Sequence, residues 1–540
     1  MLVAVGILSS RLVGFVRTSL FANILGVSPA AGAFNAAFRI PNLLQNLFGE
    51  GVLSASFIPT YAGLLARGDE EEADRVAGAV FGLLALSMSV LVLLGMVFAP
   101  QIVHLVISEK GFRPESVALT IRLVRIFFPS TGLLVGSAWC LGVLNSHRRF
   151  LLSYASPVLW NLVQIGALVA FRHGYDEAHL AILVGYSVVV GSAVQFAVQL
   201  PRVMGLLGHF WPSLDVMRAS VQQVLRGLAP VLLSRGVVQL SAYVDAYYAS
   251  SISESISATM AYAQVIYLLP VSLFGMAVSA AELPEMSGAQ GTLEEIAATL
   301  RARINRGLTR IAFFVIPSVA ALLLLGDVVG GVLYQRGTHF LPQHTRLLWY
   351  VLAGSAVGLL AATFGRLYSS AFYALKDTRT PLYFAVLRVV LTAVTAYVSV
   401  NQVPRWLGLP QDLGAVGITA TTGLAAWVEF ALLRRALGRR IGPTGLPRGR
   451  GVVLWSCALV GAAVGLGIKG ALVRRFGVAP GLEAVFGGLL LPAPRLSTLW
   501  TAGAVLLPFG GIYLTLTFLL GVSPLDGPIR RVLRLPQKGS

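Results

Sequence analysis

The sequence predicts an all-α polytopic membrane protein with about fourteen transmembrane helices, and three observations carry that prediction. Of its 540 residues, 56% are hydrophobic and 12% are charged, and the mean hydropathy is +0.77. Soluble globular proteins carry about 25% charged residues. Apolar runs of about 20 residues, the length of a membrane-spanning helix, recur from end to end. A β-barrel would instead show alternating segments of roughly 10 residues.

Apolar windows separated by loop breaks place the spans along the chain. We expect them near residues 2–26, 31–65, 77–106, 117–144, 150–171, 179–201, 221–249, 258–284, 307–334, 344–375, 381–402, 413–433, 451–473 and 498–522. The N-terminal run has no basic residue before it and no A-x-A site, so it is read as the first span and not as a signal peptide.

The distribution of basic residues predicts the orientation of these spans. An even number of spans puts both termini on one side of the membrane. The loops after even-numbered spans and the C-terminal tail hold about 23 Lys and Arg, against about 8 in the opposite loops. The positive-inside rule therefore predicts that both termini are cytoplasmic. It also accounts for the net charge of +18 as a topology signal facing anionic lipid, with no need of nucleic acid.

Several classes of chemistry have no support in the sequence. The two cysteines, Cys140 and Cys457, both lie in apolar runs, and the seven histidines are scattered, so neither a disulfide framework nor a metal site is predicted. There is no GxxxxGK[ST], HExxH or GxSxG motif for ATP, zinc or serine chemistry. We expect no cofactor and no bond-breaking enzyme.

Two stretches resemble each other and indicate an internal repeat. FGEGVLSASFIP (48–59) is similar to FGMAVSAAELP (274–284), and LNSHRR (144–149) is similar to LKDTRT (375–380). Their common order predicts two parallel six-helix lobes, residues 1–206 and 207–440, followed by two further helices and a cytoplasmic tail in 441–540.

The second span is unusually polar and broken. Pro41, Asn42, Gly49 and Gly51 fall within it. Helices interrupted by Gly and Pro at corresponding positions of two repeats are the best sequence pointer to a transport site. We therefore expect these residues to line or hinge a cavity between two rocking halves.

Charged residues within the spans are costly, at roughly 2.5–3.5 kcal/mol each on insertion scales. Those in spans 1, 2 and 7 gather where the repeat predicts the interface between halves; they are Arg11, Arg17, Arg39, Glu50, Arg235 and Asp245. Guanidinium groups in a half-buried cavity suit a phosphate or diphosphate, which they bind through bidentate charge-assisted hydrogen bonds. For the arginines of this group, the functional interpretation is favoured.

The later charges have a simpler interpretation. Arg366, Arg388 and Glu429 are expected to pair internally or to reach an interface, and Glu282 leaves both interpretations open.

The segments SRLVGFVRTSLFANILGVSPAAGAF (10–34) and FRIPNLLQNLFGEGVLSASFIP (38–59) resemble the N-terminal signature of the MurJ/MviN family. VLYQRGTHF (332–340) and FYALKDTRTP (372–381) are similar to later motifs of that family. This resemblance to lipid II flippases of the multidrug/oligosaccharidyl-lipid/polysaccharide exporter superfamily covers nearly the whole chain.

The resemblance implies transport of undecaprenyl-diphosphate-linked disaccharide-pentapeptide across the bacterial inner membrane by alternating access. Membrane lipids and cell-wall synthesis proteins are the further partners it implies. By position, Arg11 and Arg17 match two cavity arginines of the family, Glu50 matches the acid of its F-x-E-G motif, and Arg39 matches a position that is commonly Lys.

Three departures from the family pattern concern the same region. Gly32 stands where the family often has Asp, and Gln45 stands where it often has Arg. The run Ala263-Gln264-Val265 stands where the family usually has Ala-Asp-Arg, so Val265 replaces an arginine. Arg235 is our candidate to supply the lost positive charge from a neighbouring helix.

These departures keep other functions open. A flippase for another polyprenyl-diphosphate-linked glycan, of O-antigen or capsule type, fits the altered cavity. A drug or cation antiporter would need acidic residues, and Asp245 and Glu50 are thin support for it. A non-transporting scaffold descended from a flippase is the fourth hypothesis.

Overall fold

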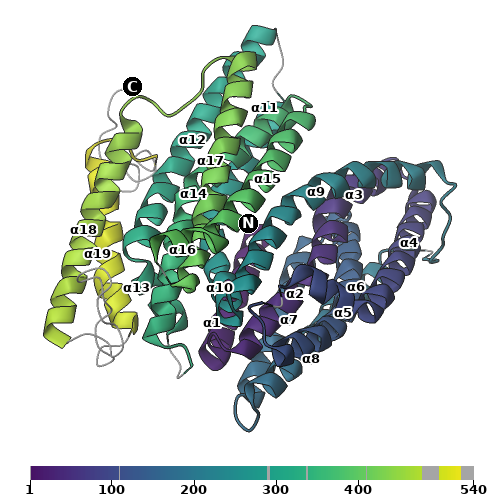
Figure 1. Ribbon diagram of the computed structural model, residues 1–540. Coiled ribbons are helices and arrows are strands. Elements are labelled where there is room, and N and C mark those ends of the chain that lie inside the picture. Colours follow the sequence, from purple (N-terminus) through teal and green to yellow (C-terminus); the bar gives the residue numbers. More distant parts are fainter. Residues whose placement is uncertain are drawn as a thin grey trace. The chain divides into compact units, whose positions relative to one another are not determined.

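The computed structural model describes residues 2–108, 110–208, 210–288, 292–335, 339–408, 410–476 and 498–524. Throughout these residues the ordered elements are helices, and they contain no strand. The chain divides into two compact units, residues 1–258 and 259–540 (Figure 1). The predicted all-α class is confirmed.

The first unit holds nine helices and the start of a tenth within its described residues. They are α1 (Leu2–Leu25), α2 (Pro29–Phe48), α3 (Glu50–Ala66), α4 (Glu70–Val97), α5 (Ala99–Val106), α6 (Pro114–Ser146), α7 (Phe150–Phe171), α8 (Glu177–Met204), α9 (Ala219–Ile252) and α10 (Glu254–Pro270). Helix α6 packs on α2, α3, α4 and α8, so it forms the centre of the unit. Local sequence starts these helices: Ser28 caps α2 and Asp69 caps α4.

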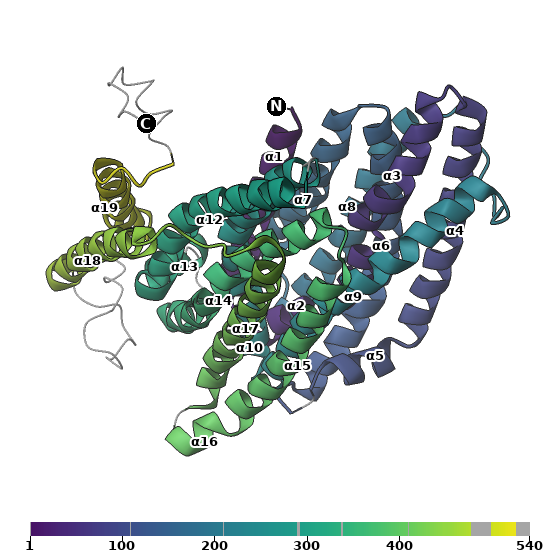
Figure 2. The same ribbon diagram turned by 90° about the horizontal axis from the view of Figure 1, so that it is seen from above.

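The second unit continues α10 and adds the remaining helices. They are the π-helix η1 (Val271–Met276), α11 (Ala277–Ser287), α12 (Leu293–Leu324), α13 (Gly326–Tyr334), α14 (Pro342–Ala374), α15 (Arg379–Asn401), α16 (Val403–Leu407), the 3-10 turn η2 (Gln411–Leu413), α17 (Gly414–Ile441), α18 (Arg450–Phe476) and α19 (Thr498–Leu519). Helices α18 and α19 lie side by side in both views (Figures 1 and 2).

Every predicted span coincides with one helix or one interrupted pair of helices. Among the described residues, eleven helices are long and apolar enough to cross a membrane. The other three predicted spans correspond to α1, to α2 with α3, and to α9, which are also helical. The polar residues of these three spans include the arginines singled out from the sequence. The chain is a multi-pass membrane protein.

The internal repeat is visible in the helices themselves. Helices α6 and α14 are both 33 residues long, and both begin with a proline, Pro114 and Pro342. The loops that follow them contain Arg148 and Lys376, the two non-glycine residues with positive φ in the described chain. In both loops the next amide bonds back to the carbonyl five residues earlier. Arg148 therefore corresponds to Lys376 in the structure. The sequence alignment of LNSHRR with LKDTRT pairs Arg148 with Arg379 instead, so it is shifted by three positions.

Packing also repeats between the two units. Helix α6 packs on α3, α4 and α8, while α14 packs on α11, α12 and α17. The third member of each set, α8 or α17, is 28 residues long and also packs on the long helix that precedes it, α7 or α15. Corresponding helices therefore have corresponding neighbours, as a parallel repeat requires.

The second span is broken as predicted, and so is its counterpart in the repeat. Helix α2 ends at Phe48, and Gly49 has extended backbone angles (φ −81°, ψ −157°) before α3 begins. In the corresponding span, α10 ends at Pro270 and a π-helical segment runs to Met276. That segment contains Phe274 and Gly275, the partners assigned to Phe48 and Gly49 from the letters alone. π-Helical turns inside α-helices are rare and frequent at functional sites.

Two glycine pairs bring helices into close contact. A Cβ on Gly358 would lie 2.3 Å from the Cα of Gly423, so α14 and α17 cross almost backbone to backbone. A Cβ on Gly461 would lie 2.8 Å from the carbonyl oxygen of Phe509, and one on Gly465 would meet Leu325 at 3.1 Å. The GxxxG pairs at 354–358 and 461–465 are therefore helix-packing contacts.

A serine-rich stretch such as residues 250–257 would be expected to form a solvated loop, but here it forms the end of α9 and the start of α10. Ser250, Glu254 and Ile256 are 2%, 7% and 0% exposed. Their neighbours supply the hydrogen bonds that solvent would otherwise provide: the Ser250 hydroxyl accepts from the Ser108 amide at 2.9 Å. Ser250 and Glu254 can be buried because backbone amides of the first unit, those of Ser108 and Arg113, donate to their side chains.

The two compact units and the predicted domains have different boundaries, because the units follow packing and the domains follow the sequence repeat. The first unit extends to Ala258 and includes α9, which packs on α2 and α3. The predicted boundary after residue 206 marks the repeat, in which α9 opens the second copy. The three domains 1–206, 207–440 and 441–540 stay a prediction.

Candidate transport site

Arg17, on α1, has a half-buried side chain held by neutral groups. Its Nη1 donates to the Gln164 side-chain carbonyl at 3.2 Å, and its guanidinium carbon lies 4.9 Å from the ring centroid of Trp160. No described carboxylate pairs with it. Arginine has five N–H donors. Among the described residues, those of Arg17 meet the Gln164 oxygen and, at a longer 3.5 Å, the Thr18 hydroxyl. A half-buried cation with unused donors is suited to an anionic ligand.

The partners of Arg17 are themselves held in place by α7 and α8. The Gln164 amide donates to the Trp160 carbonyl at 3.1 Å, and the Trp160 indole N–H donates to the Ser192 hydroxyl at 3.2 Å. The ring of Phe38, on α2, lies 6.3 Å from that of Trp160. Arg17 is therefore positioned by a network that reaches three other helices, which favours a preorganised site.

Arg39, on α2, has a different electrostatic environment. Its half-buried guanidinium interacts with Asp245 and Tyr243 of α9. The Tyr243 hydroxyl also donates to the Arg39 carbonyl at 2.5 Å. The positive charge of Arg39 is thus balanced in part by a carboxylate, whereas that of Arg17 is not. The structure brings together Arg39 and Asp245, which the sequence placed on separate spans.

The predicted hinge residues flank the break in this span. Pro41 is buried within α2, and its carbonyl accepts from the Thr131 hydroxyl of α6 at 3.4 Å. Asn42 is half-buried, and Gly49 is buried at the end of the helix. Proline removes one backbone hydrogen bond inside a helix, and Gly49 ends the helix outright. Their part in a moving cavity stays a prediction.

The remaining predicted site residues divide into two groups. The side chain of Arg11 is exposed on α1, outside the network around Arg17. The side chains of Glu50 and Arg235 and the surroundings of Gly51 lie outside the described part of the structure, although the backbone is helical at all three positions. The hypothesis that Arg235 replaces a lost charge is therefore untested.

The sequence model of one protein family, "Lipid II flippase MurJ", matches residues 21–483. This match spans most of the chain and includes α2, α3 and the helices of both units. The chain belongs to the MurJ family. Both broken spans and most of the network around Arg17 fall within the matched range.

Relatives of the MurJ family cover most of the chain. "Probable lipid II flippase MurJ" of Rhizobium tropici is 32% identical over 471 residues, which are 85% of this chain and 84% of that protein. The protein of the same name from Rhizobium meliloti (strain 1021) is 31% identical over 434 residues, 79% of this chain and 77% of that one. Family membership thus rests on individual relatives as well as on the family model.

Solved structures show the same fold. "Lipid II flippase MurJ, inward closed conformation" has a TM-score of 0.75 and 20% identity, over 98% of this chain and 100% of that chain. An inward-facing multidrug resistance MATE family transporter has a TM-score of 0.63 and 18% identity, over 79% of this chain and 95% of that chain. At these identities the likeness concerns the fold alone.

The structure explains one departure from the MurJ pattern. A Cβ on Gly32 would lie 2.5 Å from the carbonyl oxygen of Glu254 and 2.7 Å from its Cβ. Helix α2 therefore meets the start of α10 so closely that no side chain fits at position 32. The Glu254 carboxylate, 7% exposed as a residue, accepts from the Arg113 amide at 2.8 Å. An acidic group thus stands next to the place where the family often has Asp.

The other two departures have no such packing cause. Gln45 and Val265 are half-buried, and Gln264 is exposed. Nothing in the structure explains why these positions lack the arginines common in MurJ proteins.

The later intramembrane charges mostly pair, as the simpler interpretation predicted. Arg388 donates to Glu429 at 3.1 Å. Glu282, 4% exposed, pairs with Arg310 at 3.2 Å and with Arg303 at 3.6 Å. Arg366 is exposed on α14 and interacts electrostatically with Glu429. These groups have structural partners within the second unit.

Sequence reasoning missed a buried ion pair between two predicted spans. Lys469 of α18 donates to Asp327 of α13, and the two side chains are 1% and 4% exposed. The Lys469 ammonium lies 5.5 Å from the centroid of the Trp349 ring. A lysine inside the apolar run VGLGIKGALV (464–473) was the available signal, because a charge in such a run needs a partner.

Proposed function

We propose that the protein moves lipid II, an undecaprenyl-diphosphate-linked muropeptide, from the inner to the outer leaflet of the bacterial cytoplasmic membrane. Membership in the MurJ family supports the activity, and the environment of Arg17 supports the mode of recognition. Arg17 is half-buried, has neutral partners and keeps unused donors, which suits a diphosphate.

In this proposal the residues around Arg17 act in a defined order. Gln164 and Trp160 hold the guanidinium in place before cargo arrives, so little side-chain freedom is lost on binding. The planar fork then forms two parallel hydrogen bonds to one phosphate, which a lysine cannot form. Arg39 contributes a second, weaker attraction because Asp245 already balances part of its charge.

Transport further requires that the site open to the two leaflets in turn. The broken spans α2–α3 and α10–η1–α11 are our candidates for the moving elements, since a helix bends at the lowest cost where its hydrogen bonds are already interrupted. Both termini are proposed to be cytoplasmic, on the basis of the excess of Lys and Arg in the loops assigned to that side.

The membrane potential is the proposed energy source for resetting the empty site. It supplies about 2.3 kcal/mol per elementary charge per 100 mV, which is enough to bias an arginine-bearing cavity after its anionic cargo has left. Dissipating the potential in vesicles should therefore slow turnover, and equal flipping in polarised and depolarised vesicles would refute this source.

The first experiment is rescue of a bacterium depleted of its own lipid II flippase. The wild-type chain should restore growth, Arg17→Ala should not, and Arg17→Lys should restore it poorly because the fork is lost while the charge stays. Membrane insertion of each variant is checked by immunoblotting of isolated membranes. Rescue by Arg17→Ala at wild-type level would remove Arg17 from the mechanism.

A second candidate is transport of another polyprenyl-diphosphate-linked glycan. The packing of Gly32 against Glu254 favours this second candidate, because the close contact of the two helices requires glycine where the family often has Asp. The flippase-depleted bacterium also distinguishes the two candidate functions. Failure of a well-inserted wild-type chain to rescue, combined with flipping of a different lipid-linked glycan in vesicles, would support the second.

A further inference from the structure

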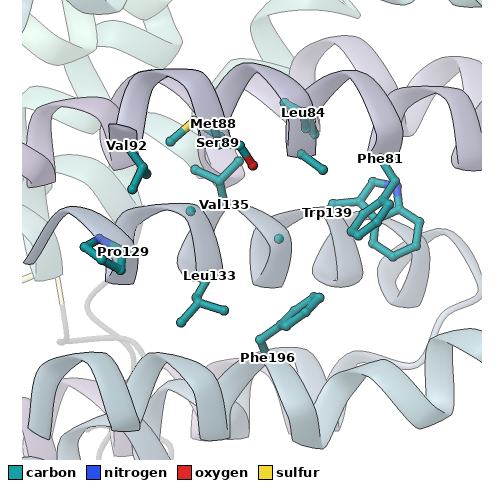
Figure 3. Close-up of a pocket in the computed structure, with 13 residues that line it drawn as sticks. Phe81, Leu84, Met88, Ser89, Val92, Pro129, Leu133, Val135, Trp139 and Phe196 are labelled. Atoms are coloured by element: carbon teal, nitrogen blue, oxygen red, sulfur yellow. The ribbon is translucent and has the colours of Figure 1, made fainter. Parts of the chain in front are cut away.

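A cavity of about 420 Å³ lies in the first unit, between α4, α6 and α8. Side chains from α4, among them Phe81 and Met88, and Phe196 from α8 converge on one face of α6 (Figure 3). Small-molecule binding cavities commonly measure about 300–1,000 Å³. This one is large enough for a ligand and belongs to no function described so far.

The lining of this cavity is almost entirely apolar. Of its thirteen residues none is charged, and Ser89 is the one with a hydroxyl group. The indole N–H of Trp139 is already used, because it donates to the Ala77 carbonyl at 3.1 Å. The cavity thus offers no site for a phosphate or a sugar, and a ligand inside it has to be hydrocarbon.

Two glycines on α6 create the space. Gly132 and Gly136 are one helical turn apart and both line the cavity. A Cβ on Gly132 would lie 3.7 Å from Val92, in ordinary contact, and one on Gly136 would lie 3.1 Å from Phe196. Larger residues at these positions would fill the cavity from its floor.

The position of the cavity indicates that its hydrocarbon ligand comes from the bilayer. It lies against the middle of α4, where Ala85 and Ser89 at its rim are exposed and neighbouring Leu86 and Val90 are 51% and 47% exposed. In a membrane-spanning helix this exposed apolar surface faces lipid chains. The cavity therefore opens onto surface that is covered by the bilayer.

The cavity is also separated from the arginine site by α6 itself. Thr131 and Phe127 of α6 face α2, through a hydrogen bond to Pro41 and a ring contact with Phe38. Most α6 residues of the cavity lining point away from that face: Pro129 and Leu133 are each two residues from Thr131, about 200° around the helix, although Val135 is only about 40° from it. A chain in the cavity therefore lies mainly against a different face of α6 from the one that meets α2.

We propose that this cavity binds one acyl chain of a bilayer phospholipid. Lipid chains are as apolar as the cavity, so burial from water does not drive binding. Packing does: an empty cavity leaves its lining atoms without dispersion partners, and a flexible chain supplies them. The bound chain stabilises the separation of α4 from α8.

The proposal is tested by photolabelling. The full-length protein is reconstituted into phosphatidylethanolamine vesicles that contain a trace of phosphatidylcholine with a diazirine in its acyl chain. After illumination, labelled peptides are mapped by mass spectrometry. We expect labelling within residues 81–92 of α4 and 129–139 of α6, in excess of other lipid-facing segments such as α7.

Filling the cavity provides the discriminating variants. Gly132→Leu should lower labelling of these segments to the level of the surrounding lipid-facing surface, and Ala85→Leu, which enters from α4, should do the same if the first variant folds poorly. Gly166→Leu is the matched control, since Gly166 is an exposed helical glycine with no atom within 4 Å of its added Cβ. It should leave the labelling unchanged.

Two results would overturn the proposal. One is labelling of the α4 and α6 segments that stays at wild-type level in folded Gly132→Leu and Ala85→Leu protein. The other is displacement of the label by a modest excess of undecaprenyl phosphate, which would assign the cavity to the polyprenyl tail of a cargo. Both results are independent of whether the protein flips lipid II, because no transport is measured.

Discussion

The Lys469–Asp327 pair is expected to hold α18 and α19 on the rest of the second unit. Around it the contact is small and apolar, formed by residues such as Leu325, Ala462 and Val505. Lys469→Met leaves the Asp327 carboxylate buried without its cation, and Asp327→Asn leaves the ammonium without its anion. Removing one partner of a buried pair costs about 3–5 kcal/mol.

The double variant, Lys469→Met with Asp327→Asn, separates the interaction energy of the pair from the effects of the two single substitutions. With both charges gone, the remaining cost is that of a buried amide, about 1–3 kcal/mol. The double variant should therefore be more stable than either single variant, although it carries both substitutions. Equilibrium unfolding of the purified protein in detergent, followed by circular dichroism, measures the three free energies. Losses that simply add would contradict a coupled pair.

The two cysteines provide a local assay of how far α18 loosens when the Lys469–Asp327 pair is broken. Cys457 of α18 is free and 3% exposed, and Cys140 of α6 is free and 0% exposed. If the pair holds α18 in place, alkylation of Cys457 by a maleimide should accelerate in Lys469→Met while alkylation of Cys140 keeps its wild-type rate. Wild-type rates at both cysteines in both single variants would refute the assigned role.

Two further predictions concern the first unit and a loop of the second. Gly32→Asp, although it restores a residue common in the family, should cost about 1–3 kcal/mol in detergent unfolding, because its Cβ would stand 2.5 Å from the Glu254 carbonyl oxygen; wild-type stability would contradict this. Burial raises the pKa of Asp377, but hydrogen bonds from Thr380 and Arg440 outweigh it and hold the pKa at about 2. The carboxylate therefore stabilises the fold at neutral pH, and this contribution is lost as the pH falls from about 4 towards about 2. Asp377→Asn should lower stability by about 1 kcal/mol at pH 7, with a difference that shrinks over that range; a constant difference in pH-dependent unfolding would contradict the assignment.

Span positions and helix breaks were predictable because they are local properties. The length of an apolar run determines whether a helix can cross the bilayer, and no distant residue alters that requirement. The break at Gly49 and its counterpart at Val271–Met276 follow from Gly and Pro within otherwise apolar runs. The resemblance to the MurJ family then indicated which of these helices are candidates to carry the site.

The pairings were not predictable because they join residues far apart in the chain. Gln164 is 147 residues from Arg17, and Asp327 is 142 residues from Lys469. Periodicity shows which face of a helix is polar, and it cannot show which other helix meets that face. The close approach of Gly32 to Glu254 is of the same kind, so a missing charge in the sequence proved to be a packing requirement.

The contrast between Arg17 and Arg39 leads to the sharpest test of the site. A half-buried arginine paired with a carboxylate is explained by stability, whereas one held only by a neutral amide and an aromatic ring is available to an anion. Gln164→Glu changes one atom group and keeps the shape of the side chain. It puts a carboxylate 3.2 Å from Nη1 and turns the neutral contact into an ion pair.

We expect this variant to fold, because the new ion pair with Arg17 offsets the lost hydrogen bond to the Trp160 carbonyl. It should fail in transport, because the new carboxylate competes with the diphosphate for Arg17 while Arg17 itself is still present. Gln164→Leu is the matched control: it removes the hydrogen bond without adding charge and should retain part of the activity. Flipping of a lipid-linked substrate in vesicles measures both. Wild-type activity of Gln164→Glu would mean that Arg17 does not meet the anionic cargo.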